Sequence, residues 1–406
     1  MCATTQHTLA LSHGGCIVRI ALATSSYDPY VGGVEEHVRN VAGLLRDRGH
    51  DVVVWTVDRD GRFAVRDVDG IEVRDLPAPL PARSLRAMAR LALRLPAAAL
   101  RWRSAFRAHR PDVIHVHCFG PNGTYARVLA RRTGTPLVIT AHGETVADDE
   151  GVFTHSRFAI ESLRAGLAES AAVTGCSQVA LDDLTERFGL PPERGVVVFN
   201  GIDLDEALGS VPTGVSGRYI AAVGRLQPMK GFDLLVEAFA KAQLPRDIRL
   251  VIGGGGPELD ALRRQAERLG ISDRVVLPGW LDRPTVGALR QGALIGVMPS
   301  RFEPFGISAL EVWRARSALI ATTHGGAPEF VSDGVDGLLV DPLDVDALAA
   351  ALRDLTGHPD RRTALAAAGA ERVRSFTWER TVDAYEGIYR EVVVAAHAET
   401  AETDIT

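Results

Sequence analysis

Short apolar runs alternate with longer amphipathic stretches along the first half of the chain. The run at 17–23 is followed by a stretch at 34–48, where apolar positions recur at helical spacing until Gly49. Uninterrupted β-branched runs of this length are typical of strands that are buried on both faces of a sheet. Further strands are predicted on the same pattern at 51–57, 113–116, 137–140, 172–174 and 196–198. The alternation predicts a parallel sheet that is covered by helices.

A second series of strands and helices follows a break in this pattern. Residues 205–217 are rich in glycine, serine and proline, and we interpret them as a linker. Helices are then predicted at 231–243 and 257–269, and strands at 219–223, 249–252, 275–277, 294–298 and 319–321.

The two series predict an α/β protein with two Rossmann-like, doubly wound parallel-sheet domains. The first is expected to span 1–206 and the second 207–377, and the last helix, within 378–406, is expected to pack back on the first domain. Ligands bind beyond the carboxyl ends of the strands in such sheets. An active site is therefore expected in the cleft between the domains.

Composition narrows the classes of function. The 406 residues carry a formal net charge of −6, which argues against a nucleic-acid binder. No run reaches the roughly 18 uncharged apolar residues of a membrane span, and no basic leader precedes an apolar run, so we expect a cytoplasmic protein. The four cysteines lack CxxC or metal-ligand spacing and are expected to be reduced. Lysine occurs only at Lys230 and Lys241; Lys230 is a candidate for a specific role, and Lys241, in the middle of a predicted helix, is interpreted as part of a solvated face.

Two glutamates follow the predicted strand at 294–298. Glu303 lies in the loop after the strand, and Glu311 lies about a turn and a half into the next predicted helix. Eight residues separate them, which is up to about 12 Å along a helix axis. This distance is too long for a shared proton, but it suits two hydroxyl-bearing ends of one ligand. The alternative is an acid that favours the helix dipole and a solvated glutamate.

Two cations follow the first strand of the second domain. Arg225 and Lys230 lie between that strand and its helix, with Gly224 and Gly231 beside them. A strand end and a helix N-terminus that carry cations and glycines form an anion site. A diphosphate fits such a site, because a guanidinium binds two oxygens and an ammonium adds a point charge.

Two weaker signals come from the first domain. Gly32 and Gly33 open its first predicted helix, where a ligand phosphate or sugar can approach the backbone; a tight bend explains them equally well. His142 lies just past a strand end, at the edge where the other motifs converge. Asp-x-Asp pairs at 67–69, 203–205 and 344–346 are interpreted as turns and helix caps rather than metal ligands.

The order of these motifs resembles that of the family 4 glycosyltransferases, which are retaining enzymes of the GT-B fold. The resemblance covers roughly residues 17–378. The motifs that carry it are Gly32-Gly33-Val-Glu35, Thr140-Ala-His142-Gly143, Asn200-Gly-Ile-Asp203, Gly224-Arg225, Lys230-Gly231, Glu303-Pro-Phe-Gly306 with Glu311, and Gly325-Gly-Ala-Pro-Glu329.

The resemblance implies a hexosyltransferase that moves a hexose from a UDP- or GDP-sugar to a hydroxyl acceptor. The second domain would bind the nucleotide sugar, and the first would bind a small-molecule, polysaccharide or lipid-linked acceptor. Arg225 and Lys230 would neutralise the diphosphate, and Gly33 would approach its β-phosphate. His142 would contact the donor sugar near its 6-position and contribute to catalysis.

The resemblance also assigns the remaining donor contacts. Glu303 and the backbone of Phe305, Gly306 and Ile307 would hold hydroxyls of the donor sugar, and Glu311 would hold the ribose. Gly279, in the turn at 278–280, is a looser candidate for the base pocket. With fixed cations at the diphosphate, neither a metal nor another cofactor is expected.

Other enzyme classes and partners are also considered. A nucleotide-sugar 2-epimerase of the same architecture is the alternative function. A dinucleotide-dependent oxidoreductase fits poorly, because Glu258 replaces the last small residue of its glycine fingerprint. The segment 82–110 contains arginines and no acid, with Arg83, Arg86, Arg90 and Arg94 on one helical face. We interpret this helical face as solvated. The alternative is that it makes peripheral contact with the inner side of an anionic membrane.

Overall fold

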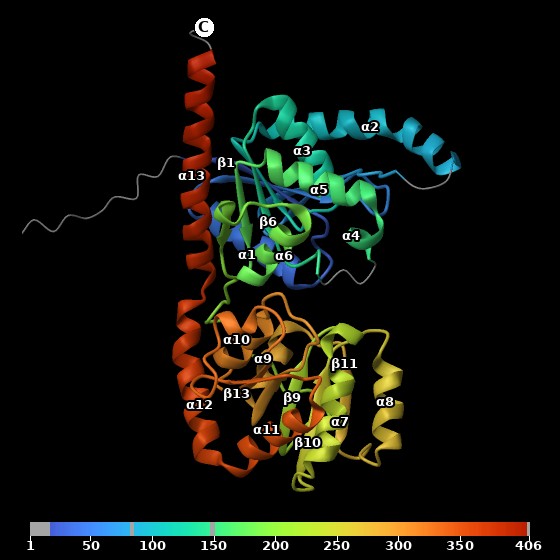
Figure 1. The fold of residues 1–406 in the computed structure, drawn as a ribbon, viewed down its shortest axis with the longest axis vertical. Helices are drawn as coiled ribbons and strands as arrows, with labels where there is room; N and C mark the ends of the chain where they lie inside the picture. The colour runs from blue at the N-terminus through green and yellow to red at the C-terminus, as the bar shows by residue number, and fades with distance from the viewer. Residues whose placement is uncertain (1–16, 82–84, 147–150, 404–406) are drawn as a thin grey trace, which may run out of the picture.

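Two sheets, parallel except for one antiparallel edge strand in the first, form two lobes that are stacked along the long axis of the molecule (Figure 1). The structure is a computed structural model, and it describes residues 17–81, 85–146 and 151–403. The N-terminal extension, Arg83 and the first residues of the arginine-rich segment lie outside the described residues. Within the described ranges, no helix combines the length and the apolarity that crossing a bilayer requires.

The first lobe contains an eight-stranded sheet in the order β3-β4-β2-β1-β5-β6-β7-β8. Side chains of β1 alternate between two cores, because successive residues of a strand point to opposite faces. Ala21 and Ala23 contact the core on one face, while Ile20 and Leu22 contact the core on the other. The strands are β1 (Arg19–Thr24), β2 (Asp51–Val57), β3 (Val65–Val68), β4 (Ile71–Leu76), β5 (Val113–His117), β6 (Leu137–Ala141), β7 (Ala172–Gly175) and β8 (Gly195–Val197).

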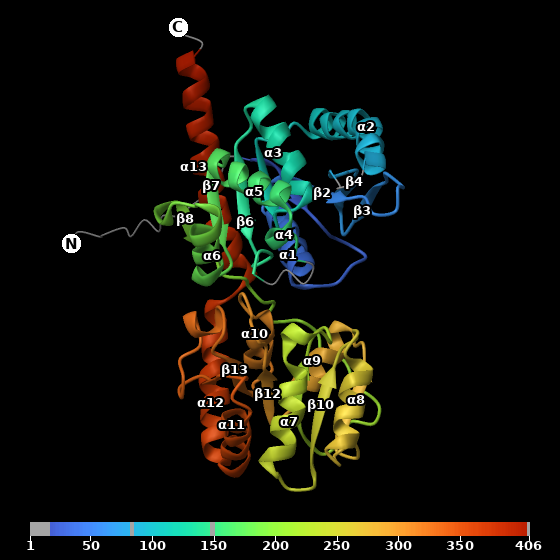
Figure 2. The ribbon, with the colours of Figure 1, turned by 45° about the vertical axis from the view of Figure 1, so that its right-hand side comes forward.

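Helices cover both faces of this sheet (Figure 2). One face packs against α2, α3, α5 and α6, and the other packs against α1 and α13. The helices of this lobe are α1 (Gly33–Asp47), α2 (Leu85–His109), α3 (Pro121–Thr133), α4 (Val152–His155), α5 (Arg157–Glu169) and α6 (Gln178–Phe188). The predicted doubly wound domain is confirmed.

The second lobe contains a six-stranded parallel sheet in the order β11-β10-β9-β12-β13-β14. Its strands are β9 (Arg218–Val223), β10 (Ile248–Gly253), β11 (Val275–Gly279), β12 (Ile295–Met298), β13 (Ala318–Thr322) and β14 (Leu338–Val340). Its helices are α7 (Phe232–Ala242), α8 (Leu259–Arg268), α9 (Arg283–Gln291), α10 (Ile307–Arg314), α11 (Val345–Gly357) and α12 (Pro359–Arg372). The second doubly wound domain is confirmed as well.

The chain crosses between the lobes twice, and the two crossings lie side by side. Ile202, between β8 and β9, forms a parallel bridge with Thr377, just before α13 (Trp378–Thr403). A Cβ on Gly201 would collide with the backbone of Trp378, so this close approach requires glycine. From there α13 runs back along the first lobe and packs on α1 (Figure 1).

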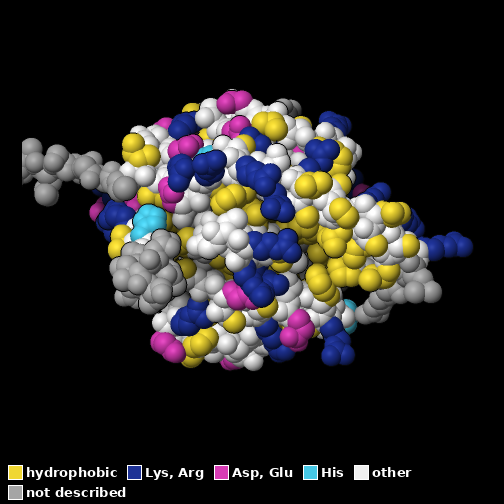
Figure 3. All heavy atoms as spheres, turned by 90° about the horizontal axis from the view of Figure 1, so that it is seen from above, with side chains coloured by type: hydrophobic (Ala, Val, Ile, Leu, Met, Phe, Trp, Pro, Cys, Tyr) yellow, Lys and Arg dark blue, Asp and Glu magenta, His cyan; other side chains and the backbone are white. Residues whose placement is uncertain are grey.

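Helix α2 is largely exposed on the first lobe. Trp102 and Ala105 anchor its C-terminal half in the core, whereas Met88, Leu93, Leu95 and Leu100 are exposed. Figure 3 views the molecule from the end where the first lobe lies, and it shows hydrophobic side chains gathered on the side where α2 lies. Arg86, Arg90 and Arg94 are exposed as predicted. The surface of α2 is therefore both basic and apolar.

Candidate active site

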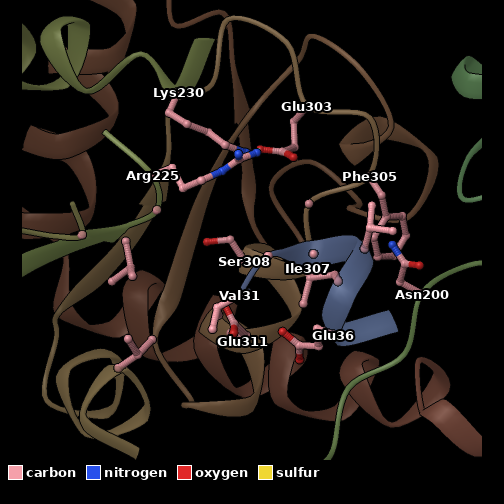
Figure 4. A pocket seen from close by; sticks show the side chains of 18 of the residues that line it. Val31, Glu36, Asn200, Arg225, Lys230, Glu303, Phe305, Ile307, Ser308 and Glu311 are labelled. Atoms are coloured by element: carbon pink, nitrogen blue, oxygen red, sulfur yellow. The ribbon is translucent and has the colours of Figure 1, made fainter. Parts of the chain in front are cut away.

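A cavity of about 610 Å³ lies between the lobes. The first lobe contributes the loop before α1, the second contributes the segment after β9 and the start of α10, and Figure 4 shows their side chains converging. A Cβ on Gly33 would lie 3.9 Å from the Ile307 side chain of the opposite lobe, so the two walls nearly touch there.

Lys230 and Glu303 meet in the second-lobe wall of this cavity. The Lys230 ammonium lies 2.6 Å from Glu303 Oε2, which also accepts a hydrogen bond from Ser300 Oγ at 2.9 Å. Gly231, next to Lys230, has φ +65°, and a Cβ there would collide with the Pro299 carbonyl, so this position requires glycine. The pair thus joins the loops that follow β9 and β12.

Arg225 extends towards the same point from the end of β9 (Figure 4). Its guanidinium makes no hydrogen bond or ion pair with any residue that the structure describes. Gly306, at φ +99°, starts α10 directly beside Glu303, and the first N–H groups of a helix have no partner within the helix. Two cations and a helix N-terminus thus face one space, which is an arrangement suited to a diphosphate.

Glu311 lies deeper, on α10, and forms an ion pair with Arg290 of α9, which is 3% exposed. A second charge network joins the lobes beside it. Arg283 of α9 contacts Glu36 of α1 at 2.8 Å and Glu206 of the linker at 2.5 Å. Burial raises the pKa of the Glu36 carboxyl, and the Arg283 charge opposes this shift. The sequence did not indicate a role for Arg283, Arg290 or Glu36, because the residues with which they pair are remote in the chain.

His142 belongs to a buried cluster of imidazoles in the first lobe. Its Nε2 lies 3.2 Å from His117 Nδ1, and its ring stacks edge-on against His37 at 4.7 Å. His37 Nδ1 lies 2.7 Å from Asn200 Oδ1, and its Nε2 lies 3.1 Å from the Tyr385 hydroxyl of α13. Since an amide oxygen only accepts, Nδ1 of His37 donates and the Tyr385 hydroxyl donates to Nε2.

The same cluster has the donor atoms of a metal site. Ring nitrogens of His37, His117 and His142 lie within 4.8 Å of one another, and three histidines are one of the ligand sets of catalytic zinc. Both nitrogens of His37 are already engaged, by Asn200 and Tyr385. A metal at this point would have to displace one of those bonds, so we interpret the cluster as a hydrogen-bonded network.

The buried histidines make the stability of the protein depend on pH. Burial lowers the pKa of His37 to about 4 and lowers those of His115, His117 and His142 well below 6.5. The unfolded chain binds protons at these positions below pH 6.5 while the folded chain does not. The full stability is therefore present above pH 6.5 and is lost as the pH falls from there towards 4.

Each of these imidazoles is expected to contribute a slope of about 1.4 kcal/mol per pH unit in that window. Two buried carboxyls, Glu36 and Glu144, have raised pKa values and act in the opposite direction, but four imidazoles outweigh them. Urea unfolding at pH 7.5 and 5.5 checks this balance. A midpoint at pH 5.5 that equals or exceeds the one at pH 7.5 would contradict it.

Most of the predicted site residues lie in the walls of this one cavity. The lining includes Gly33, His142, Arg225, Lys230, Glu303, Phe305, Gly306, Ile307 and Glu311. Gly279 is placed outside this lining, where its carbonyl accepts from Gly254 N, and the adjacent Trp280 lines the wall instead. The helix after Glu303 begins at Ile307, so Glu311 lies in its second turn.

The Asp-x-Asp pairs have local backbone roles, as predicted. Asp67 Oδ1 accepts from Gly70 N in a turn at 3.0 Å, and Asp203 Oδ1 accepts from Asp205 N at 2.9 Å. Asp344 caps α11 through Ala347 N. Their carboxylates are thus engaged in turns and a helix cap.

Two family models together match most of the chain. Residues 31–206 match the model described as Glycosyltransferase Family 4, and residues 210–372 match the one described as Glycosyl transferases group 1. The break between the matches falls in the linker that joins the two lobes.

Curated relatives match over nearly the full length. A D-inositol 3-phosphate glycosyltransferase of Mycolicibacterium smegmatis is 32% identical and covers 88% of this chain and 86% of its own. The enzyme of that name from Acidothermus cellulolyticus is 31% identical, over 92% of this chain and 88% of its own. A glycogen synthase of Mycobacterium tuberculosis is 30% identical, over 92% and 94%.

Solved structures share the fold at lower identity. Sucrose-phosphate synthase of Thermosynechococcus elongatus superposes with a TM-score of 0.76 at 23% identity, covering 93% of this chain and 99% of that one. The HepE protein of Anabaena, in complex with UDP-glucose, superposes with a TM-score of 0.69 at 21% identity, covering 95% and 99%.

Proposed function

Because this chain belongs to glycosyltransferase family 4 and has the two-lobed GT-B architecture, we propose that it moves a hexose from a UDP- or GDP-sugar to a hydroxyl acceptor with retention of configuration. The observation that carries this proposal is the convergence of Arg225 and Lys230 beside Glu303 at the start of α10. HepE has been solved with UDP and with UDP-glucose, which supports a nucleotide-sugar donor here.

In this proposal, Arg225, Lys230 and the N-terminus of α10 receive the diphosphate. Glu303 and the backbone of Phe305, Gly306 and Ile307 hold the sugar hydroxyls. Glu311 holds the ribose and forms an ion pair with Arg290. Gly33 closes on the β-phosphate from the opposite lobe.

The reaction breaks the bond between the anomeric carbon and the phosphate oxygen. The acceptor oxygen forms the new bond on the same face of the sugar, and its proton passes to the departing phosphate. Negative charge grows on the diphosphate as the bond breaks, and fixed cations aimed at that charge are the largest catalytic term available. His142, which burial keeps neutral, contacts the sugar from the first lobe.

The fixed cations also imply that no divalent metal is required. We expect UDP or GDP, at about 100 times its Kd, to stabilise the protein by about 2.7 kcal/mol against thermal unfolding. We expect the same shift, and the same rate of transfer, in excess EDTA. A nucleotide shift or a rate that disappears with EDTA and returns with Mg²⁺ would contradict the metal-free assignment.

A nucleotide-sugar 2-epimerase was the alternative, and the comparisons do not favour it. The matched family models and the relatives at 30–32% identity are described as transferases or synthases. Product analysis without an acceptor separates the two functions, since an epimerase would convert the donor and a transferase would not.

Peripheral membrane contact through α2 is a further part of the proposal. Leu93 is 81% exposed and Leu100 66%, and exposed arginines share the helix with them. Such a face suits the surface of an anionic bilayer. We expect the protein to sediment with phosphatidylglycerol vesicles at low salt, and Leu93→Asp with Leu100→Asp to reduce this at least fivefold. Equal sedimentation of variant and wild type would leave α2 a solvated face.

A further inference from the structure

A second cavity, of about 450 Å³, lies in the first lobe and adjoins the cleft that receives the donor in the proposed function. The two cavities share Arg225 and Gln227 as lining residues. A volume of several hundred Å³ is that of a pocket for a small organic molecule. Its place against the diphosphate-binding cations makes it the space from which a hydroxyl can reach the donor.

The lining of this second cavity is mostly apolar. Two proline-flanked segments and two helices supply it, through Leu80, Phe119, Pro121, Val152, Phe153 and Phe158. Phe158, on α5, is 43% exposed even though a phenylalanine is normally covered in a folded protein. An aromatic ring that is left uncovered at the mouth of a pocket is suited to contact an apolar ligand.

Among the residues that the structure describes around the cavity, the ionisable groups provide no separate site for an anionic acceptor. Arg225 is the cation of the described lining, and in the proposed function it binds the donor diphosphate. The other residue of a charged type in the described lining is Glu144. Its Oε1 accepts from Phe119 N and its Oε2 from His142 N, both at 2.7 Å, so it fastens the loop and offers no positive charge to a phosphate.

Guanidiniums close to the cavity are engaged elsewhere. Arg187 donates to the carbonyls of Thr145 and Phe153 and pairs with Asp183. Arg59 donates to the Ser25 carbonyl and lies over the Tyr30 ring at 4.8 Å. A phosphate bound to the acceptor would therefore have to compete with the partners of Arg187, while Arg59 is exposed and makes one long hydrogen bond, at 3.4 Å.

We propose that the acceptor of this enzyme is a neutral hydroxyl compound with an apolar aryl or alkyl body, bound in the second cavity. This inference rests on the proposed glycosyl transfer and deepens it. The proposed acceptor differs from the inositol 3-phosphate that the names of several relatives specify. The cations of the cleft are assigned to the donor diphosphate instead. Burial of the apolar body against Phe153 and Phe158 supplies the binding energy, and the hydroxyl faces Arg225.

The test is a competition between acceptor chemistries. The nucleotide sugar whose nucleotide gives the largest thermal shift is offered with D-inositol 3-phosphate, 4-methylumbelliferone or octyl glucoside, and kcat/KM is measured for each. We expect at least one of the two apolar hydroxyl compounds to exceed inositol 3-phosphate by 100-fold or more. A preference for inositol 3-phosphate would overturn the inference.

Failure of the donor chemistry is separated from failure of the acceptor assignment. The nucleotide thermal shift reports on the donor site alone, so its absence counts against the proposed function. If the shift is present, calorimetric titration of both apolar probes into the UDP-bound or GDP-bound enzyme measures occupancy of the second cavity. A normal shift with neither binding of nor transfer to the apolar probes overturns the acceptor inference and leaves the proposed function intact.

Phe158→Lys tests the acceptor preference by adding a positive charge to the lining of the second cavity. Because Phe158 is partly exposed, we expect the variant to fold with the wild-type melting temperature. A cation at the mouth of the cavity should lower kcat/KM for the apolar acceptor about tenfold and raise it for inositol 3-phosphate. Leu343→Lys, at an exposed leucine of the second lobe, is the matched control and should change neither value. Equal effects of the two substitutions would contradict the assigned cavity.

The same chemistry can be presented free or by a lipid, and vesicles distinguish the two sources. Diacylglycerol in neutral and in anionic vesicles offers a hydroxyl on an apolar body at a membrane surface. Faster transfer to soluble octyl glucoside identifies a free acceptor, whereas transfer only from anionic vesicles identifies a lipid acceptor that α2 helps to reach. Either result supports the apolar acceptor, and transfer to inositol 3-phosphate in preference to both contradicts it.

Discussion

Lys230→Ala is expected to lower kcat for transfer by about 10²–10³-fold, which is the cost of removing one fixed group that stabilises developing charge. In the proposed function, the departing diphosphate becomes more negative beside this ammonium, which pairs with Glu303 near the start of α10. Glu303→Ala is expected to have a loss of the same order, because it removes both the sugar contact and the partner that positions Lys230. Steady-state kinetics with the preferred nucleotide sugar measures both.

The control for this prediction is the second lysine of the chain. Lys241, on α7, is exposed and pairs with Glu237 and Asp346, remote from the cleft. Lys241→Ala should retain wild-type kcat, and both lysine variants should unfold within a few degrees of the wild type. Near-normal turnover of Lys230→Ala and Glu303→Ala would refute the diphosphate assignment.

The Lys230–Glu303 pair leaves one oxygen of a buried acid free for the sugar contact that we propose. Glu303 is 9% exposed, and both the ammonium and the Ser300 hydroxyl bind its Oε2. Its other oxygen therefore remains available to accept from a sugar hydroxyl. A carboxylate that is already compensated by a cation requires less desolvation when the ligand arrives.

Sequence patterns predicted the residues that follow strand ends. Arg225, Lys230 and Glu303 each lie a few residues beyond a buried strand, and parallel strands end at the same edge, so their convergence follows from the topology. The strands that were not predicted are the antiparallel β3 and β4 and the edge strand β14. Charged residues interrupt the apolar ones in β3 and β4, and β14 has only three residues, so none of them has the long apolar run of the central strands.

The partners of the site residues could not be predicted. Arg290 and Glu311 come from adjacent helices, and Glu36 and Arg283 come from different lobes, so only the packed structure brings them together. The same holds for His37 and His117, which read as ordinary residues of a helix and a strand. The sequence shows only that a titratable side chain stands among apolar residues at these positions. That pattern does not identify the residue with which it pairs.

Helix α13 shows how a distant segment completes the first lobe. Its apolar face, at Val382, Tyr385, Tyr389 and Val392, recurs at helical spacing and is buried in the core that also contains α1. Tyr389 hydroxyl lies 2.7 Å from His115 Nδ1, and His115 Nε2 lies 2.6 Å from Thr140 Oγ1, two residues before His142. The last helix thus supports the strand end that presents His142 to the cleft.

Tyr385→Ala is expected to destabilise the protein by about 3–5 kcal/mol, the usual cost of truncating a buried aromatic side chain. The ring is fully buried, stacks on Tyr389 at 6.2 Å and packs edge-on against His115 at 5.0 Å. Its loss opens a cavity and leaves His37 Nε2 buried without its donor. Urea unfolding at pH 7.5, followed by tryptophan fluorescence, measures the change.

Tyr385→Phe separates the hydroxyl from the ring. It keeps the packing and removes the hydrogen bonds of the hydroxyl to His37 Nε2 and Thr140 Oγ1, so we expect a loss of about 1–3 kcal/mol. Because the first-lobe cluster then loosens next to His142 while the donor cations stay in place, kcat should fall with little change in the nucleotide thermal shift. Arg390→Ala, at an exposed position of the same helix, is the control for both variants. If Tyr385→Ala were no less stable than Arg390→Ala, the packing of α13 would contribute nothing to the first lobe, and its hydrogen bonds could not position His142.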